Sequence, residues 1–274
     1  MTNETAALES ILEYVESELA FASSHYNDSY LDRRVSSRVR RADVGGYEDY
    51  LELLRTDLDE QEALLDALSI NVTGFFRNPD VWEGIRDVLR TLSDDRKRGR
   101  IRAWSAACAD GREPYSLSIL AHADPAIDES AVHVLATDIS ETALQTAREG
   151  VYEDTRTTDI DDQLSVLKDY ERFVDRSGDT FRVRDRVKRS VTFERHDLIN
   201  DDPKSDFDLI ICRNLFIYID NEYKTPMLET IADSLRPGGY LVIGKSETIP
   251  PSLTSVFSVC DGRLRIYRRE PTGS

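Results

Sequence analysis

The sequence predicts an α/β fold in which a parallel sheet follows an all-helical N-terminal region. Three observations support this prediction. Apolar residues recur at helical spacing through the first 70 residues, and short apolar strands alternate with helices from Ile101 onward. Residues 207–212 are apolar nearly throughout, as in a strand that is buried on both faces. Such alternation favours a parallel sheet with helices on both sides.

The N-terminal region is expected to contain four helices. Apolar residues recur every three or four positions in residues 8–19 and 31–42, so each stretch presents one apolar face. Gly45-Gly46 is expected to end the second helix, because glycine readily adopts the left-handed conformation found at helix ends. Two shorter helices are expected from Tyr47 onward and around Leu64.

The α/β region begins with a helix from Pro79, because proline suits a first helical turn. A hairpin is expected near the C-terminus, where Asp261-Gly262 forms a two-residue turn and makes the sheet edge antiparallel. Between them, strands are expected at residues 101–105, 132–137, 191–195, 207–212 and 240–243, with helices at 113–122, 141–148 and 224–235.

One stretch of about 40 residues, between Arg148 and Val191, interrupts the alternation. Phe173-Val174 and residues 181–184 flank Ser177-Gly178-Asp179, a pattern typical of a small antiparallel hairpin. The expected domains are a helical domain with an interdomain segment at 1–78 and an α/β domain at 79–274, with a β-subdomain inserted at about 165–191.

The composition excludes several classes of protein. The formal net charge of −17 argues against a nucleic-acid partner, because an acidic surface repels phosphates. Only six of the 35 basic residues are lysine, a bias that suggests a high-salt cytoplasm, where ions screen self-repulsion. No apolar run approaches the roughly 20 residues that span a bilayer. With no signal peptide at the N-terminus, we expect a cytoplasmic protein without membrane insertion.

The cysteines and histidines give no sign of a metal site. Cys108, Cys212 and Cys260 are far apart and form no CxxC pair. The four histidines show no ligand spacing either, so no metal is expected.

Two candidate ligand contacts follow expected strands. Residues 105–116 form a turn of small residues before a helix, which lets the backbone approach a ligand closely, but it is neither GxGxxG nor a P-loop. Asp138 ends the second strand, where an acid can accept ribose hydroxyls. It is equally typical of an acidic helix start, with Ser140 as the better cap.

Several segments together resemble the chemotaxis receptor methyltransferases of the CheR family. Residues 71–77, Asn-Val-Thr-Gly-Phe-Phe-Arg, resemble N-x-T-x-F-F-R, and residues 111–116, Gly-Arg-Glu-Pro-Tyr-Ser, resemble G-E-E-P-Y-S. Residues 212–218, Cys-Arg-Asn-Leu-Phe-Ile-Tyr, resemble C-R-N-V-x-I-Y. Residues 235–239 and 244–247 resemble the L-x-P-G-G and G-H-S-E elements. The resemblance spans nearly the whole chain and implies a Rossmann-like, class I S-adenosylmethionine-dependent methyltransferase sheet.

The resemblance also implies roles for individual residues. Arg77 and Tyr218 match the two residues that face the methyl group and are the catalytic candidates. On the residues alone, a surface position before Asn78-Pro79 is the favoured interpretation of Arg77, and Tyr218 is also typical of a half-buried aromatic with its hydroxyl at the rim. The cofactor-binding residues implied are Asn71, Thr73, Arg77, Glu113, Asp138, Asp197, Leu198, Arg213 and Asn214.

Three residues depart from the family pattern. Asp197 stands where the family has an asparagine near the adenine. Arg112 replaces the first acid of the turn, next to Glu113, which matches the acid that holds the methionine end. Lys245 replaces a histidine. We expect Arg112 to alter the charge beside the cofactor.

The activity that the resemblance implies is a protein-glutamate O-methyltransferase. It would transfer a methyl group from S-adenosylmethionine to glutamate side chains of chemotaxis receptors, giving methyl esters and S-adenosylhomocysteine in sensory adaptation. A glutamate with a pKa of about 4.3 is already an anion at neutral pH, so the reaction needs no general base. The alternative is a non-catalytic S-adenosylmethionine-binding regulator of a signalling partner. A Rossmann-type oxidoreductase is disfavoured by the missing GxGxxG.

The expected partner is the cytoplasmic helical domain of chemotaxis receptors. The inserted hairpin is short at residues 175–180, whereas family members that dock on a receptor's C-terminal pentapeptide carry a longer loop, so we expect pentapeptide-independent docking by a monomer. A cluster of basic residues in the second helix is equally typical of a solvated face and of a site for an acidic receptor helix. The cluster consists of Arg33, Arg34, Arg38, Arg40 and Arg41.

Overall fold

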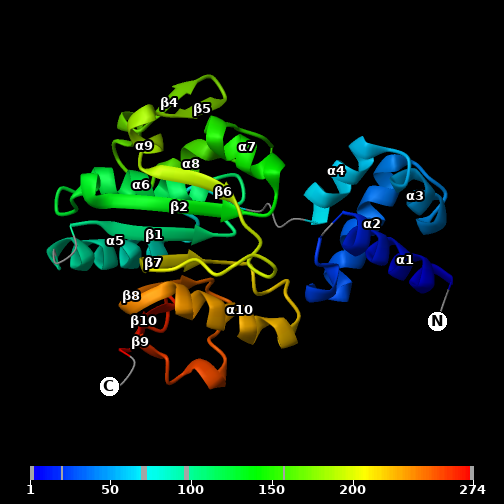
Figure 1. Cartoon of the computed structure of the whole chain (residues 1–274). Coiled ribbons are helices and arrows are strands. Elements are labelled where there is room, and N and C mark those ends of the chain that lie inside the picture. The colour runs from blue at the N-terminus through cyan, green and yellow to red at the C-terminus, as the bar shows by residue number, and fades with distance from the viewer. Residues whose placement is uncertain (1–2, 20, 69–72, 96–98, 157, 272–274) are drawn as a thin grey trace. The chain divides into compact units, whose positions relative to one another are not determined.

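The computed structural model describes residues 3–19, 21–68, 73–95, 99–156 and 158–271 (Figure 1). The chain divides into two compact units. Met1–Ile70 and Phe216–Lys224 form a helical unit, and Asn71–Leu215 and Thr225–Ser274 form an α/β unit. The helical unit therefore includes a short segment from much later in the chain.

Four helices make up most of the helical unit. Their apolar stripes meet in a core that includes Ile11, Val15, Val35 and Tyr50, with α1 packed on α3 and α2 on α4. Burial of these stripes holds short helices that would be marginal in isolation. The helices are α1 (Asn3–Glu18), α2 (Asp28–Ala42), α3 (Tyr47–Leu54) and α4 (Leu58–Leu68), with the 3₁₀ helix η1 (Ser23–His25) between the first two.

The end of α2 differs from the expectation. The helix ends at Ala42, and Asp43 follows in the left-handed conformation with a φ of 54°. Gly46 instead immediately precedes α3. The short polar side chain of aspartate tolerates this conformation, so the glycine pair is not needed to end the helix.

The late segment is held in the helical unit by backbone hydrogen bonds. Ile219 forms an antiparallel bridge with Tyr26, and the N–H of Asn27 donates to the carbonyl of Tyr218 over 3.0 Å. The N–H of Asp220 donates to the carbonyl of His25 over 2.8 Å. These bonds connect residues almost 200 positions apart and fix the backbone of Tyr218 in the helical unit.

A seven-stranded sheet forms the centre of the α/β unit (Figure 1). Its order is β6-β2-β1-β7-β8-β10-β9, with parallel pairing from β6 to β8 and antiparallel pairing beyond. The expected parallel sheet with an antiparallel hairpin at its edge is confirmed. The strands are β1 (Ile101–Ala106), β2 (Val132–Asp138), β6 (Val191–Arg195), β7 (Phe207–Cys212), β8 (Leu235–Ile243), β9 (Phe257–Asp261) and β10 (Ile266–Arg269).

Helices cover this sheet, as its apolar strands require. Both α6 and α7 pack against β2 and β6, while Gly84 of α5 lies against Ile266 of β10. All six residues of β7 are buried, as its composition predicts. The helices of this unit are α5 (Pro79–Asp94), α6 (Arg112–Ala123), α7 (Glu141–Glu149) and, from residue 225 onward, α10 (Asn221–Ser234), with the 3₁₀ helices η3 (Glu129–Ala131) and η5 (Pro251–Leu253).

Two details near the C-terminus differ from the expectation. The hairpin turn covers Gly262 to Arg265 instead of two residues, because Asp261 Oδ1 accepts the N–H groups of Arg263 and Leu264 and Arg265 is left-handed. Strand β8 starts at Leu235, directly after α10, and not at Tyr240. The register shift on β7 shows that residues 236–239 are accommodated as a bulge.

The interruption of the alternation contains a small antiparallel sheet of order β3-β5-β4. The expected hairpin is present, but a third strand, β3, pairs with β5 and comes from outside the expected insertion. The buried residues Tyr152, Phe173 and Phe181 join the core of the α/β unit. Its elements are β3 (Val151–Glu153), α8 (Ile160–Leu164), η4 (Tyr170–Arg172), β4 (Val174–Ser177), β5 (Thr180–Val183) and α9 (Asp185–Lys188).

No helix in the described ranges is both long and apolar enough to cross a membrane.

Candidate functional site

The turn after β1 has an unusual backbone made possible by small residues. Ala107, Ala109 and Gly111 all have positive φ angles, of 57°, 49° and 87°. Non-glycine residues in this conformation are strained, and such strain is concentrated at functional sites. A Cβ on Gly111 would lie 2.7 Å from the Cβ of Ala147, so the glycine also allows α7 to approach. The turn brings backbone close to the carboxyl end of the sheet.

Asp138 is buried at the end of β2 and is bonded to this turn. Its Oδ2 accepts the N–H of Ala109 over 2.7 Å, and its Oδ1 accepts the N–H of Ser140 over 3.0 Å. Ser140, and not Asp138, caps α7 by accepting the N–H of Ala143. Burial raises the pKa of Asp138, and the backbone N–H groups of Ser140, Ala109 and Ile139 oppose that shift. A carboxylate has about four acceptor directions, so Asp138 retains capacity for a ligand hydroxyl.

Glu113, Arg213 and Arg77 converge beside the same turn. Glu113, in the first turn of α6, accepts the Ser105 hydroxyl over 2.8 Å and lies 3.4 Å from Nη1 of Arg213. Burial raises the pKa of Glu113, while the charges of Arg213 and Arg77 lower it. Burial lowers the pKa of Arg213, and the neighbouring Glu113 raises it. This cluster holds two opposite charges away from water, each stabilised by the other.

Arg213 also holds the chain around Arg77. Its Nη2 donates to the carbonyl of Arg77 over 3.0 Å and to Oδ1 of Asn78 over 2.8 Å. The indole N–H of Trp82 donates to the same carbonyl over 3.1 Å. The backbone at Arg77 is therefore fixed from both α5 and the end of β7.

Asn214 is positioned by a buried carboxylate. It is left-handed, with a φ of 63°, and its N–H donates to Oε2 of Glu247 over 3.2 Å. The N–H of Gly244 donates to the same oxygen over 2.5 Å. Glu247 thus joins the loops that follow β7 and β8.

Asp197 organises the loop after β6. Its Oδ1 accepts the N–H of Ile199 over 2.8 Å, and its Oδ2 accepts the side-chain amide of Asn200 over 2.8 Å. The preceding residue, His196, donates its N–H to the carbonyl of Asp138 over 3.0 Å. Leu198 is half-buried in this loop. The loop is therefore joined to the end of β2.

The remaining candidates are more scattered. Thr73 is half-buried in the α/β unit, and Asn71 lies outside the described residues. Tyr218 belongs to the helical unit, where its ring lies 4.8 Å from that of Tyr30. The structure therefore brings Arg77, Glu113 and Arg213 together and assigns Tyr218 to the other unit.

The two basic departures from the family pattern, Arg112 and Lys245, have ion-pair partners. Arg112 binds Asp110, two residues earlier, with Nη2 2.8 Å from Oδ2 and with little exposure of either side chain. The pair balances the charge that Arg112 adds to the turn. Lys245 donates to Oδ2 of Asp80 over 2.7 Å in a more exposed position.

Three of the candidate residues lie at the carboxyl ends of neighbouring strands of the sheet. β2, β1 and β7 are neighbours in the strand order, and Asp138, Glu113 and Arg213 lie at or just after their carboxyl ends. In open α/β sheets, ligands bind at the carboxyl ends of the strands. A buried acid for a ligand cation, a second acid for ribose hydroxyls and a strained backbone turn fit the expected cofactor. In the described part of the chain, no group of three or more His, Cys, Asp and Glu residues is arranged to hold a metal ion.

The arginines of α2 fall into two classes. Arg38 is largely buried and pairs with Glu60, with Nη2 2.5 Å from Oε2 and Nε 3.0 Å from Oε1. The side chain of Arg34 is half-buried over the ring of Tyr30. Exposed positions in the cluster are Arg33, Arg40 and Arg41.

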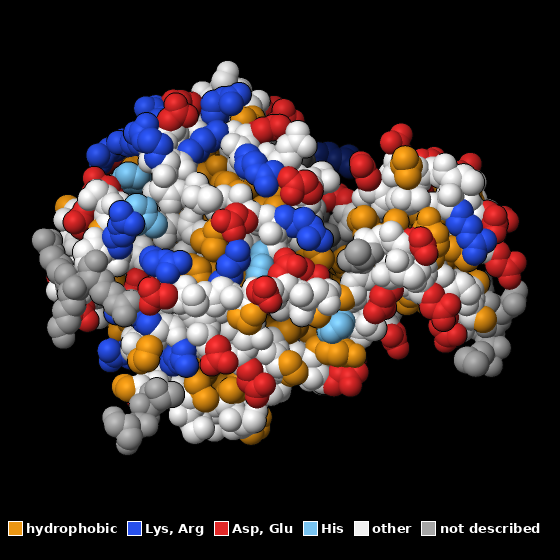
Figure 2. Space-filling view, viewed as in Figure 1, with side chains coloured by type: hydrophobic (Ala, Val, Ile, Leu, Met, Phe, Trp, Pro, Cys, Tyr) orange, Lys and Arg blue, Asp and Glu red, His pale blue; other side chains and the backbone are white. Residues whose placement is uncertain are grey.

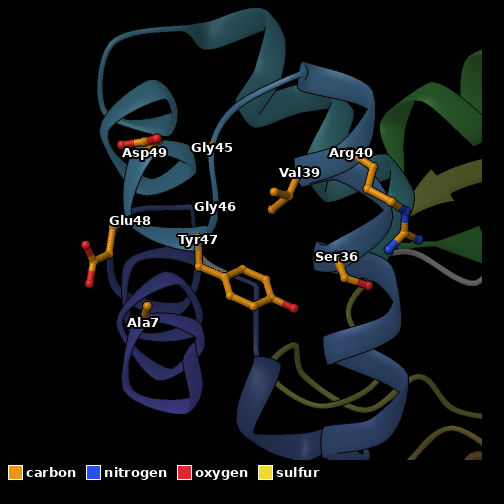
Figure 3. Close-up of a pocket in the computed structure, with 9 residues that line it drawn as sticks. All are labelled: Ala7, Ser36, Val39, Arg40, Gly45, Gly46, Tyr47, Glu48 and Asp49. Carbon is orange, nitrogen blue, oxygen red and sulfur yellow. The ribbon is translucent and has the colours of Figure 1, made fainter. Parts of the chain in front are cut away.

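A pocket of about 370 Å³ lies in the helical unit between α2 and the start of α3 (Figure 3). Val39 and Ser36 of α2 line one side, and Tyr47 extends its ring toward them (Figure 3). The hydroxyl of Tyr47 donates to Asp32 over 2.7 Å. The pocket is built by residues of the helical unit alone, and none of the expected cofactor contacts lines it.

Basic side chains gather over the small sheet and α9 on the face shown in Figure 2. In the small sheet and its adjoining short helices, Arg172, Arg182, Arg184 and Arg189 are exposed, and Arg184 pairs with Asp175. A chain of net charge −17 thus has a locally basic face, to which acidic protein segments are attracted.

Some residues that support the candidate site could not be identified from the sequence patterns. Ser116 accepts the N–H of Phe76 over 3.0 Å, Gln163 accepts that of Phe75 over 2.8 Å, and the hydroxyl of Tyr152 donates to the carbonyl of Asp110 over 2.7 Å. The partners are 40 to 88 positions apart, so spacing gives no signal for them. Ser116 alone lies within a motif that the sequence singled out.

Comparisons with known proteins agree with the division of the chain into two units. The protein-family model described as "CheR methyltransferase, SAM binding domain" matches residues 71–266. The family model described as "CheR methyltransferase, all-alpha domain" matches residues 6–69. The chain is 34% identical over 236 residues to the "Chemotaxis protein methyltransferase" of Listeria monocytogenes, covering 86% of this chain and 87% of that one. It is 33% identical over 238 residues to "Chemotaxis protein methyltransferase 1" of Vibrio cholerae, covering 84% of each.

Proposed function

Because the chain belongs to the CheR methyltransferase family, we propose that it methylates glutamate side chains of chemotaxis receptors, with S-adenosylmethionine as methyl donor. The products would be glutamate methyl esters and S-adenosylhomocysteine. The observation that carries the proposal is the match to both family domains over nearly the whole chain. The convergence of Glu113, Arg213 and Arg77 at the ligand-binding edge of the sheet supports it.

The residues of the α/β unit divide the binding between them in this proposal. When bound, S-adenosylmethionine supplies a methyl group on a positively charged sulfur. Glu113 would hold the cationic amino-acid end, and Asp138 would accept a ribose hydroxyl. Asn71 and Thr73 would close over the cofactor. Asp197, Leu198, Arg213 and Asn214 complete the proposed contacts.

The methyl transfer asks little acid–base chemistry of the protein. A receptor glutamate is ionised at neutral pH, since its ordinary pKa is about 4.3, and its carboxylate oxygen is itself the nucleophile. The new oxygen–carbon bond forms as the sulfur–carbon bond breaks, and the bonding electrons remain on sulfur. Arg77 would hold the acceptor carboxylate with paired N–H donors, and Tyr218 would orient it. Orientation of this kind lowers barriers by about 7–11 kcal/mol in favourable cases.

The proposed docking surface on the helical unit includes only some of the arginines in the cluster that the sequence suggests. Arg33, Arg40 and Arg41 are exposed and suit an acidic receptor helix, whereas Arg38 is engaged by Glu60. The β4–β5 hairpin turns tightly at Gly178-Asp179, which supports docking without a receptor pentapeptide. A receptor-tail peptide that captured the protein by itself would contradict this mode of docking.

We further propose adaptation to high salt, on the basis of 52 acidic against 35 basic residues. At 1 M salt the Debye length is about 3 Å, which screens the repulsion among surface acids. Unfolding at low salt and refolding in molar KCl is the expected behaviour. Full stability at low salt would exclude the adaptation.

The decisive experiment measures transfer of radiolabelled methyl from S-adenosylmethionine to receptor cytoplasmic domains of the same cell, followed by alkaline release. Base-labile label is expected with the wild-type chain and should be lost in Arg77→Ala and strongly reduced in Tyr218→Phe. Arg148→Ala is a matched control, because Arg148 forms an exposed ion pair with Glu141. Tight S-adenosylhomocysteine binding without label on any receptor would instead indicate a non-catalytic regulator.

A further inference from the structure

The segment Thr73–Asn78, which we term the strap, has an irregular backbone that other elements hold in place. Phe76 and Asn78 are both left-handed, with φ angles of 47° and 60°. Non-glycine residues keep such conformations only where their surroundings over-determine them. The strap contains Thr73 and Arg77, two of the residues assigned to the proposed reaction.

Three side chains from regular elements fix the C-terminal half of the strap. Ser116 of α6 accepts the N–H of Phe76, and Trp82 of α5 and Arg213 after β7 donate to the carbonyl of Arg77. The ring of Phe76 is buried against that of Trp82. This half is therefore anchored to the main sheet and its helices.

The N-terminal half is held differently, by the inserted region. Oε1 of Gln163 in α8 accepts the N–H of Phe75 over 2.8 Å. A Cβ on Gly74 would lie 3.0 Å from the same oxygen, so an alanine there would displace the Gln163 amide by a few tenths of an ångström. The ring of Phe75 meets that of Tyr152 edge-on at 5.2 Å. Because α8 lies between β3 and β4, these contacts join the strap to the small sheet.

We infer that Gln163 is a positioning residue for the methyl transfer, holding the strap so that Thr73 and Arg77 are presented to the cofactor and substrate. The inference rests on the proposed function for the roles of those two residues. The chemistry at position 163 is specific, because a backbone N–H needs an acceptor and an apolar side chain of similar size supplies none. Loss of the acceptor would leave the amide of Phe75 without this partner and let the strap shift.

The test compares Gln163→Leu with Gln163→Glu. The leucine variant keeps a side chain of similar size but has no acceptor, and the glutamate variant keeps an oxygen at the same reach. We expect Gln163→Leu to raise the KM for S-adenosylmethionine and the Kd of S-adenosylhomocysteine about tenfold, with a smaller effect on kcat, as for the loss of about one hydrogen bond. Gln163→Glu should restore both constants to within about threefold of wild type.

Two further variants keep the inference open to contradiction. Gln145→Leu is the matched control, because Gln145 is an exposed glutamine of α7 whose side-chain amide donates to Glu149 of the same helix. It should leave both constants unchanged. Gly74→Ala disturbs the same contact from the strap and should weaken S-adenosylhomocysteine binding even if Gln163→Leu does not fold. Wild-type binding by Gly74→Ala and Gln163→Leu, or equal losses in Gln163→Leu and Gln163→Glu, would overturn the inference.

Calorimetric binding of S-adenosylhomocysteine separates this inference from the proposed substrate, because it needs no methyl acceptor. If the wild-type chain binds the product but labels no receptor, the proposed substrate is wrong, and a selective loss of binding in Gln163→Leu still supports the inference. A wild-type chain that does not bind the product would overturn both.

Discussion

Arg213 and Glu113, 100 positions apart in the sequence, form a buried ion pair with Nη1 of the arginine 3.4 Å from Oε2 of the glutamate. The side chains are 1% and 11% exposed, so neither charge is well hydrated. This pair connects the turn after β1 with the end of β7. The second terminal nitrogen of Arg213, Nη2, connects both to the strap by donating to the carbonyl of Arg77.

Removal of one partner of this pair should destabilise the fold strongly. Glu113→Ala leaves the charge of Arg213 buried and without its carboxylate, which costs about 3–5 kcal/mol in comparable pairs. The double variant Glu113→Ala with Arg213→Met should lose less than the sum of the single losses, because no unpaired charge remains. Urea denaturation of the wild type, the two single variants and the double variant gives the coupling free energy between the two side chains. Additive losses would mean that the two side chains do not depend on each other.

Gly111→Ala should destabilise the chain more than an alanine at a comparable open turn. At Gly111 the φ of 87° is compounded by a Cβ contact of 2.7 Å with Ala147. Gly178 also has a positive φ, of 64°, but a Cβ there would have no neighbour within 4 Å. Gly178→Ala is therefore the control and should cost about 1 kcal/mol for its backbone alone, with a clearly larger loss at Gly111. Equal melting temperatures for the two variants would contradict close packing of α7 on the turn.

Glu247→Ala should weaken both the fold and cofactor binding. Its Oε2 accepts the N–H groups of Gly244 and Asn214, and each buried donor left without a partner costs about 1–3 kcal/mol. The Kd of S-adenosylhomocysteine should rise, because the left-handed Asn214 loses its support. Glu270→Ala, at an acid close to the C-terminus, provides the comparison and should leave that Kd unchanged. Wild-type affinity in Glu247→Ala would show that Asn214 holds its conformation independently.

The arginines of α2 should separate into structural and surface residues. Arg38→Ala breaks a largely buried pair with Glu60 and should cost about 3 kcal/mol. Arg40→Ala, at an exposed position of the same helix, should change stability by less than about 0.5 kcal/mol. If α2 docks on receptors, Arg40→Ala should slow receptor labelling at the lowest salt concentration at which the wild-type protein is still folded, without a change in melting temperature. Thermal denaturation and labelling rates, measured side by side, distinguish the two roles.

Stability should fall as the pH drops below about 6.5, in part through His122. Burial lowers the pKa of this histidine, a shift that the hydrogen bond to the carbonyl of Arg186 and the charge of Glu129 oppose and the charges of Arg186 and Arg189 reinforce. The unfolded chain therefore binds the proton more readily than the folded chain. The stabilisation that this difference in pKa contributes is complete above the ordinary histidine pKa of about 6.5. It is lost as the pH falls toward the lower pKa of His122 in the folded chain.

Melting temperatures between pH 8 and pH 5 test this expectation. His122→Gln should flatten the decline of melting temperature with falling pH. Part of the decline should remain in this variant, because burial also lowers the pKa of His196. His133, an exposed histidine of β2, is the control position, and His133→Gln should leave the slope unchanged. An identical slope in wild type and His122→Gln would exclude the contribution of His122.

The local patterns of the sequence determined most of the secondary structure. Apolar periodicity and turn residues act over a few positions, so the helices of residues 3–68 and the five parallel strands could be predicted from them. The three-residue strand β3 is too short for a periodic signal, and it forms because β5 offers it a partner. The longer turn after Asp261 likewise depends on side-chain hydrogen bonds that the Asp-Gly pair does not reveal.

The sequence by itself determined the residue types and strand ends of the candidate site, since Glu113, Asp138 and Arg213 stand in motifs or directly after apolar runs. Only the tertiary structure decided their connections: Arg213 with Glu113, Gln163 with the strap, and Arg38 inside the helical unit. It also decided that residues 216–224 belong with the helices, through the bridge between Tyr26 and Ile219. The physical reason is that hydrogen bonds and ion pairs depend on distance in space, and the folded chain brings together groups whose separation in sequence carries no signal.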